Sequence, residues 1–126
     1  MTFTPENITE LHEDEILVFG SNMAGHHGGG AARTAHEKFG AKWGKAEGLS
    51  GQSYAFPTLN RDYSKRTIEE LKASKDKLYI CAMLNPETTF FVTKVGTGIA
   101  GFTLEEMRDV FEGEKPKNVV LPKEFS

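Results

Sequence analysis

The sequence contains only one cysteine, Cys81, so no disulfide bond forms within the chain. One thiol without a CxxC companion also gives no framework for a metal site, and we expect neither a metal nor a cofactor. No apolar run approaches the ~20 residues that a membrane-spanning helix needs. The first residues, MTFTPENITE, lack the apolar core and basic lead of a signal peptide. These absences predict a cytoplasmic protein without a membrane partner.

Basic charge is also sparse. The net charge is −3, and no run of lysine and arginine exceeds two residues. A protein that binds nucleic acid through its phosphates normally presents a broad positive surface, so unmodified nucleic acid is not an expected partner. A ligand that carries phosphate must then be held by local backbone geometry rather than by many lysines.

The chain has 126 residues, which predicts one domain with one sizeable core. Short apolar runs that end in glycine, proline or small polar residues predict strands, and apolar residues spaced by three or four predict helices. Strands that alternate with helices favour an α/β fold with a largely parallel or mixed sheet. The expected strands are 15–22, 53–56, 88–95 and one within 117–122, the expected helices include 31–39 and 104–111, and 42–52 is expected to be a glycine-punctuated loop.

Two further patterns bear on the helices. The run KLYICAML on its own fits a buried strand, but Ile68, Leu71 and Leu78 keep helical spacing across 67–84, so we favour a helix there. Thr103 is followed three residues later by Glu106, the pattern of a capping box. It predicts that a helix begins directly after Thr103.

Two strand–loop–helix units, 16–39 and 90–111, each carry a glycine-rich turn before the helix. The turns are GHHGGG (25–30) and GTGIAG (96–101). In parallel α/β sheets such turns meet at the carboxyl edge of the strands, where ligands usually bind. Glycine lets consecutive N–H groups converge on an anion, and a helix N-terminus adds about half a positive charge. Two such turns side by side predict a site for a pyrophosphate.

Neither turn matches a standard nucleotide motif. GHHGGG is not followed by the Lys-Ser/Thr pair of a P-loop, and no βαβ unit with a ribose-binding acid follows the glycines at 96, 98 and 101. Each turn alone is therefore compatible with a mere connector. Their combination favours a ligand.

Three segments resemble the macro domain family. VFGSN…GGGAARTAH resembles its strand that ends in asparagine and is followed by a glycine-rich loop and an alanine-rich helix. VGTGIAGFTLEEMRDVF resembles its second ligand loop and following helix, and SYAFPT the strand between them. The chain also resembles compact bacterial and phage macro-like proteins, over Ile16 to Pro122. The resemblance implies one three-layer α/β domain over 1–126 with a core of about 15–122, a mixed sheet and helices on both faces.

For function, the resemblance implies binding of ADP-ribose or an ADP-ribosylated substrate, which includes modified nucleic acid. The two loops would cradle the diphosphate, Asn22 would lie near the distal ribose, and Phe102 would pack against a ribose or the cleft edge. His27, beside the glycines, is favoured over His26 as a donor or general base. The implied ligand-binding residues are Phe19, Gly20, Ser21, Asn22, His27, Gly28, Gly29, Gly30, Ala31, Gly96, Thr97, Gly98, Ile99, Ala100, Gly101 and Phe102, with Asn22 and His27 as candidate catalytic residues.

Hydrolysis of an ADP-ribosyl linkage stays open. One catalytic branch of the family carries an acid just after the glycine run, where this chain has Ala31, Ala32 and Arg33. If the protein is an enzyme, we expect water to attack the anomeric carbon of the distal ribose, oriented by Asn22 and His27. The alternatives are a non-catalytic reader and a binder of another nucleotide-derived signal.

Overall fold

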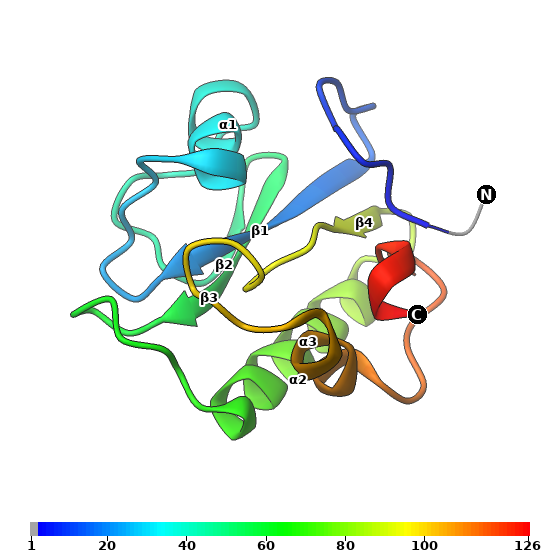
Figure 1. The fold of residues 1–126 in the computed structure, drawn as a ribbon. Coiled ribbons are helices and arrows are strands. Elements are labelled where there is room, and N and C mark those ends of the chain that lie inside the picture. The colour runs from blue at the N-terminus through cyan, green and yellow to red at the C-terminus, as the bar shows by residue number, and fades with distance from the viewer. Residues whose placement is uncertain (1–2) are drawn as a thin grey trace.

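The computed structural model describes residues 3–126 and shows an α/β fold with one mixed sheet (Figure 1). The strands of this sheet lie in the order β2-β3-β1-β4-β5. Along the chain the elements are β1 (Glu15–Asn22), α1 (Gly30–Lys38), β2 (Gly48–Ser50), β3 (Ser53–Leu59), α2 (Ile68–Leu84), β4 (Thr89–Val92), α3 (Leu104–Phe111), β5 (Val119–Val120) and a short 3-10 helix (Lys123–Phe125).

Strand β1 forms the centre of the sheet. It runs parallel to β3 on one side and to β4 on the other, so that Leu17 stands opposite Ser53 and Phe91. Strand β5 extends the sheet in parallel beside β4, and the short β2 pairs in the antiparallel sense with β3. Because both faces of the central strands are covered, these strands are apolar runs rather than alternating ones.

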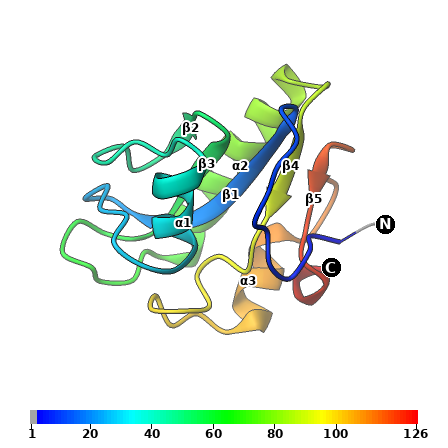
Figure 2. The same cartoon turned by 90° about the horizontal axis from the view of Figure 1, so that it is seen from above.

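Two apolar clusters lie on opposite faces of the sheet. Leu17, Phe19 and Ala55 pack with Ala35 and Phe39 under α1. The larger cluster fills the other face and includes residues of α2 and α3. Figure 1 shows α1 on one side of the sheet and the other two helices on the opposite side, and Figure 2 shows the strand order from above. The expected three-layer arrangement, with helices on both faces, is therefore shown.

Helices α2 and α3 begin with the same capping motif. The side chain of Thr67 accepts a hydrogen bond from the Glu70 N–H, and the Glu70 carboxylate accepts one from the Thr67 N–H. Thr103 and Glu106 repeat this exchange at the start of α3. Each capping box satisfies N–H groups that a helix start otherwise leaves unpaired. The predictions of a helix within 67–84 and of a cap at Thr103 are confirmed.

Two strands depart from the expectation around residue 50. Residues 48–50, expected to be loop, form β2 because they pair with the start of β3. Strand β3 was expected to end before Pro57, yet it continues to Leu59. The register against β1 shifts between Ser21 and Asn22, so the proline lies beside a bulge, where a strand tolerates the loss of an N–H donor.

Strand β4 is shorter than expected and ends at Val92 rather than at Val95. The next residue, Thr93, directs both its N–H and its hydroxyl to the Val18 carbonyl, at 3.1 and 2.7 Å. The chain then turns into the second glycine loop. Over residues 3–126, no helix has the length and hydropathy that crossing a membrane requires.

Candidate functional site

The chain leaves the neighbouring strands β1 and β4 in opposite directions. From β1 it passes through α1 to the β3 side, and from β4 it passes through α3 on the other face to β5 (Figure 2). When the connections after two neighbouring parallel strands run to opposite faces of the sheet, a crevice forms at the carboxyl ends of these strands. A cavity of about 500 Å³ lies there, and both glycine loops line it. This volume suits a small-molecule ligand, for which pockets span roughly 300–1,000 Å³.

The structure brings most of the predicted site residues together around this cavity. Those that line it are Gly20, Ser21, Asn22, Gly28, Gly29, Gly30, Ala31, Gly96, Gly98, Ile99 and Ala100. Two loops separated by more than sixty residues in the sequence therefore form the walls of one site. Phe19, His27, Thr97, Gly101 and Phe102 are not part of the lining.

Asn22, at the end of β1, closes the first turn of the glycine loop. Its side-chain Nδ2 donates to the His26 carbonyl at 2.9 Å, and its Oδ1 accepts the His26 N–H at 3.0 Å. A primary amide has two N–H donors and two acceptor lone pairs. One donor and one lone pair of Asn22 thus remain beside the cavity.

The start of α1 differs from that of the other two helices. Gly29 occupies the N-cap position without a side-chain hydrogen bond, and the first turn contains no acidic residue. By helix geometry the N–H groups of Gly30, Ala31 and Ala32 have no acceptor within the helix. All three residues line the cavity. The positive end of the α1 dipole therefore lies at the cavity wall without a neutralising side chain.

Three glycines at the cavity wall are not required by the fold. Gly28, Gly29 and Gly98 avoid the left-handed region, and a Cβ added to any of them meets no atom of the described residues within 4 Å. Gly96 is different, since its φ is +80° and its Cβ would stand 2.9 Å from the Met107 sulfur. Glycine at 96 serves the packing of α3. At 28, 29 and 98 it leaves bare backbone at the cavity wall.

The second loop also offers unpaired donors. Within the described part of the chain, the N–H groups of Gly98, Ile99 and Ala100 make no hydrogen bond. The loop is closed behind them by the Gly101 N–H, which donates to the Gly98 carbonyl at 3.0 Å. Successive unpaired N–H groups in such a turn are suited to binding an anion.

His27 lies beneath the first loop rather than in the cavity. The residue is 1% exposed, and Nε2 lies 2.8 Å from the Lys42 carbonyl. A carbonyl only accepts, so Nε2 carries the proton. Nδ1 has no partner. Phe19, equally buried, meets the His27 ring edge-on with centroids 5.2 Å apart. Both side chains pack in the interior next to the loop and do not line the cavity, so we do not assign His27 a catalytic role.

The remaining predicted residues shape the second loop from outside the cavity. Phe102 is buried in the large core, and its N–H donates to the Gly96 carbonyl at 2.8 Å. The Thr97 hydroxyl donates to the Lys94 carbonyl at 2.8 Å. The buried Phe102 side chain thus packs in the core next to the loop, and its expected contact with a ribose or the cleft edge stays a prediction.

His26 and Tyr63 also line the cavity. From the sequence, His26 ranks below His27 as a site residue, and Tyr63 is not expected in the site. Nδ1 of His26 lies 2.6 Å from the Tyr63 hydroxyl. The His26 ring also stacks on Trp43, with centroids 5.3 Å apart and 22° between the planes. Adjacent side chains point in different directions, so a buried His27 implied an outward His26. No local pattern identified Tyr63, which follows β3 by four residues.

Side-chain charge contributes little to the cavity. Lys94 lines it, but its Nζ pairs with Glu6 at 2.8 Å and with Glu124 at 3.8 Å. The hydrogen bond between Lys94 and Glu6 lowers the pKa of the carboxyl and raises the pKa of the ammonium. Among the described residues, no aspartate or glutamate lines the cavity. The lining of the cavity is therefore close to neutral and rich in backbone donors.

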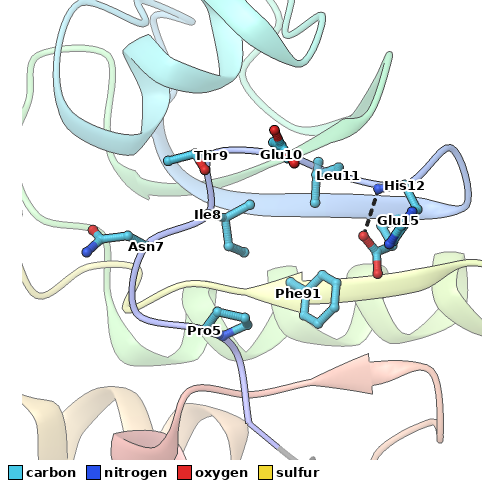
Figure 3. Close-up of a pocket in the computed structure, with 9 residues that line it drawn as sticks. All are labelled: Pro5, Asn7, Ile8, Thr9, Glu10, Leu11, His12, Glu15 and Phe91. Atoms are coloured by element: carbon cyan, nitrogen blue, oxygen red, sulfur yellow. Dashed lines mark hydrogen bonds between the residues drawn. The ribbon is translucent and has the colours of Figure 1, made fainter.

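A second concavity, of about 330 Å³, lies between the N-terminal segment and the sheet (Figure 3). It is lined by apolar side chains such as Ile8, Leu11 and Phe91, together with His12 and Glu15. The Glu15 carboxylate accepts the His12 N–H at 2.8 Å and so serves the local turn. None of the predicted site residues lines this concavity.

Comparisons of the chain with protein-family models, with curated proteins and with solved structures gave no match. The resemblance of the two loops to macro domains therefore stays a prediction from the sequence. The function of the site is inferred below from its own geometry.

Proposed function

We propose that the cavity binds ADP-ribose or an ADP-ribosyl group, with the diphosphate held between the two glycine loops. One observation carries this proposal. Gly28, Gly29 and Gly98 present bare backbone from both loops to one cavity, at positions where neither conformation nor packing requires glycine. A side chain there would extend from the cavity wall, whereas bare backbone lets a phosphate approach the N–H groups closely.

The donors suit a diphosphate rather than a single phosphate. The uncapped first turn of α1 supplies N–H groups and a helix dipole on one wall, and the unpaired N–H groups of 98–100 supply the other. Each wall can take one phosphate of a pyrophosphate. Backbone donors do not add net charge, which fits a protein whose net charge is −3.

A sugar next to the diphosphate would meet polar groups of the first loop. Asn22 keeps one amide donor and one acceptor, and Nε2 of His26 makes no hydrogen bond within the described residues. Hydroxyl groups both donate and accept, so they match such a mixed set. In the macro-like interpretation this end of the cavity takes the distal ribose.

Binding without hydrolysis is the function that the lining favours. An acid–base mechanism needs a positioned base, and the cavity holds no carboxylate among the described residues. Hydrolysis is the second candidate function, and His26 is then the candidate general base. Its Nδ1 contacts Tyr63, whereas its Nε2 is unpaired among the described residues and lies beside the cavity. If the protein hydrolyses ADP-ribosyl linkages, His26→Gln should remove turnover of an ADP-ribosylated protein while it leaves affinity for ADP-ribose largely intact.

Isothermal titration with ADP-ribose tests the binding proposal directly. AMP and ribose 5-phosphate, which carry one phosphate each, serve as comparison ligands, and cyclic ADP-ribose tests for a related nucleotide signal. We expect ADP-ribose to bind more tightly than either monophosphate. At a hundredfold excess over Kd, it should stabilise the fold by about 2.7 kcal/mol. No heat and no thermal shift at millimolar ADP-ribose would contradict the proposal.

A further inference from the structure

Segment 60–66, which joins β3 to α2, contacts both glycine loops. The Tyr63 hydroxyl lies 2.6 Å from Nδ1 of His26 in the first loop. Nζ of Lys65 donates to the Gly101 carbonyl in the second loop at 3.1 Å, and lies 4.6 Å from the centroid of the Phe102 ring beside it. Two side chains two positions apart thus connect walls that are otherwise remote in sequence.

The segment is itself held in one conformation by its own hydrogen bonds. The Asn60 N–H donates to the Ser64 carbonyl at 2.8 Å, and the Tyr63 N–H donates to the Asn60 carbonyl at 3.0 Å. The Ser64 hydroxyl and N–H both donate to the Asp62 carboxylate, at 2.6 and 3.0 Å. This turn keeps Tyr63 at a φ of 65°, the one positive value among the described non-glycine residues. Such a conformation persists only where the surroundings impose it.

The far end of the segment is attached to the body of the fold. Nη1 of Arg66 donates to the Pro57 carbonyl in β3 and to the Ser74 hydroxyl in α2, both at 2.9 Å. Ser74 is buried in α2. The segment therefore has a fixed base, a rigid turn and one contact with each loop.

We propose that segment 60–66 is a brace that sets the separation of the two glycine loops, with Tyr63 and Lys65 as the positioning residues. This inference rests on the proposed function, because the separation matters for a ligand that spans both loops. Loops held in the bound arrangement lose less conformational freedom on binding, which increases affinity. The Tyr63 ring also lines the cavity, although its hydroxyl is already engaged with His26.

The brace predicts a difference between ligands. A diphosphate contacts both walls, so its affinity depends on their separation. A monophosphate contacts one wall and depends on it much less. A residue that merely stabilises the fold would change the affinity for both ligands in the same proportion.

Tyr63→Phe and Lys65→Met test the brace, since each removes one polar contact and keeps most of the side chain. Two matched controls exist. Tyr79→Phe removes a buried hydroxyl that has no hydrogen-bond partner within the described part of the chain. Arg61→Met removes a cation from the same exposed segment, where Arg61 makes no side-chain hydrogen bond or ion pair with the described residues.

Each brace variant should weaken ADP-ribose binding about five- to tenfold, as expected for one lost hydrogen bond, and AMP binding at most about twofold. Amide hydrogen exchange gives a second result that needs no ligand. Tyr63→Phe should accelerate exchange at Gly25 and His26, whose N–H groups are bonded in the first loop, and Lys65→Met at Gly101 and Phe102. The controls should change neither quantity.

The proposal fails if the brace variants leave the exchange of both loops unchanged, whatever the ligand result. It also fails if ADP-ribose and AMP weaken equally, because the segment then contacts the ligand without setting the separation. If the unaltered protein does not bind ADP-ribose, the proposed function fails separately. The exchange rates still decide whether the segment holds the loops.

Discussion

Gly25 and Gly44 approach each other so closely that Gly25 has no room for a side chain. The Gly44 N–H donates to the Gly25 carbonyl at 2.8 Å, and a Cβ on Gly25 would stand 2.4 Å from the Gly44 carbonyl carbon. Gly25 also has a φ of +74°, which L side chains rarely adopt. This contact attaches the first glycine loop to the segment before β2.

We expect Gly25→Ala to destabilise the protein by about 2 kcal/mol or more, because the added methyl group meets backbone and the conformation is strained. Gly28→Ala is the matched control. A Cβ on Gly28 meets no atom of residues 3–126 within 4 Å, so the effect of this substitution should stay within about 0.5 kcal/mol. Urea unfolding of the two variants measures the difference. Equal stabilities would mean that the loop does not adopt this close contact.

Gly29→Val tests the first loop as a ligand wall. Gly29 has an extended φ of −156° and open space around it, so the fold tolerates a side chain there. Because the residue lines the cavity, the added bulk should abolish ADP-ribose binding while the melting temperature stays nearly unchanged. Gly29→Ala should give an intermediate affinity. Normal affinity in the valine variant would remove this loop from the site.

Much of the fold could be predicted from short patterns. The spacing of apolar residues from Ile68 to Leu78 predicted the correct helix where the local run KLYICAML was ambiguous. A helical period becomes recognisable only in a window that covers several turns. Strand β2 was missed, since its three residues become a strand only by pairing with β3. The extension of β3 past Pro57 likewise depends on a register shift against β1, which no local pattern encodes.

The candidate site shows the same limit. The high glycine content identified both loops, because glycine allows backbone conformations and close approaches that other residues do not. It did not distinguish Gly96, which accommodates the Met107 side chain, from Gly98, which faces the cavity. The choice between His26 and His27 depends on which ring the tertiary fold buries. Tyr63 reaches the site through a turn whose hydrogen bonds become visible only in three dimensions.

Salt should affect ligand affinity only weakly. The lysine that lines the cavity is already paired with two carboxylates, so ligand phosphates would displace few counterions. Between 50 and 200 mM salt we expect ADP-ribose affinity to fall about threefold, as for roughly one phosphate–cation contact. Titrations at the two concentrations measure this ratio. A much steeper dependence would indicate a polyanionic ligand such as nucleic acid.

Low pH should reduce the stabilisation that the capping boxes give to the starts of α2 and α3. Hydrogen bonds from the N–H groups of Thr67 and Thr103 hold the pKa values of Glu70 and Glu106 below the ordinary value of 4.5. Because these pKa values are lower in the folded state, the stabilisation is present above the unfolded value and is lost as the pH falls through the folded one.

Melting temperatures measured from pH 6 down to pH 3 should therefore fall, and Glu106→Gln should flatten part of this decline. The glutamine keeps an oxygen that accepts the Thr103 N–H but has no proton to gain. Glu105→Gln is the neighbouring control, because the Glu105 side chain makes no hydrogen bond to the start of α3 in the described structure of residues 3–126, and it should keep the full pH dependence. A decline of equal slope in all three proteins would contradict the assignment.

The last prediction separates the second loop from the helix that follows it. Thr103 accepts the Glu106 N–H at 3.0 Å, and its hydroxyl serves α3 rather than the cavity. Thr103→Ala should therefore cost about 1 kcal/mol of stability and change ADP-ribose affinity little. Gly98→Val should do the reverse, because Gly98 has open space on the cavity side and neighbours the unpaired N–H groups. Unfolding and titration of both variants measure the contrast. If both lose only stability, the second loop is a connector and the diphosphate site is wrong.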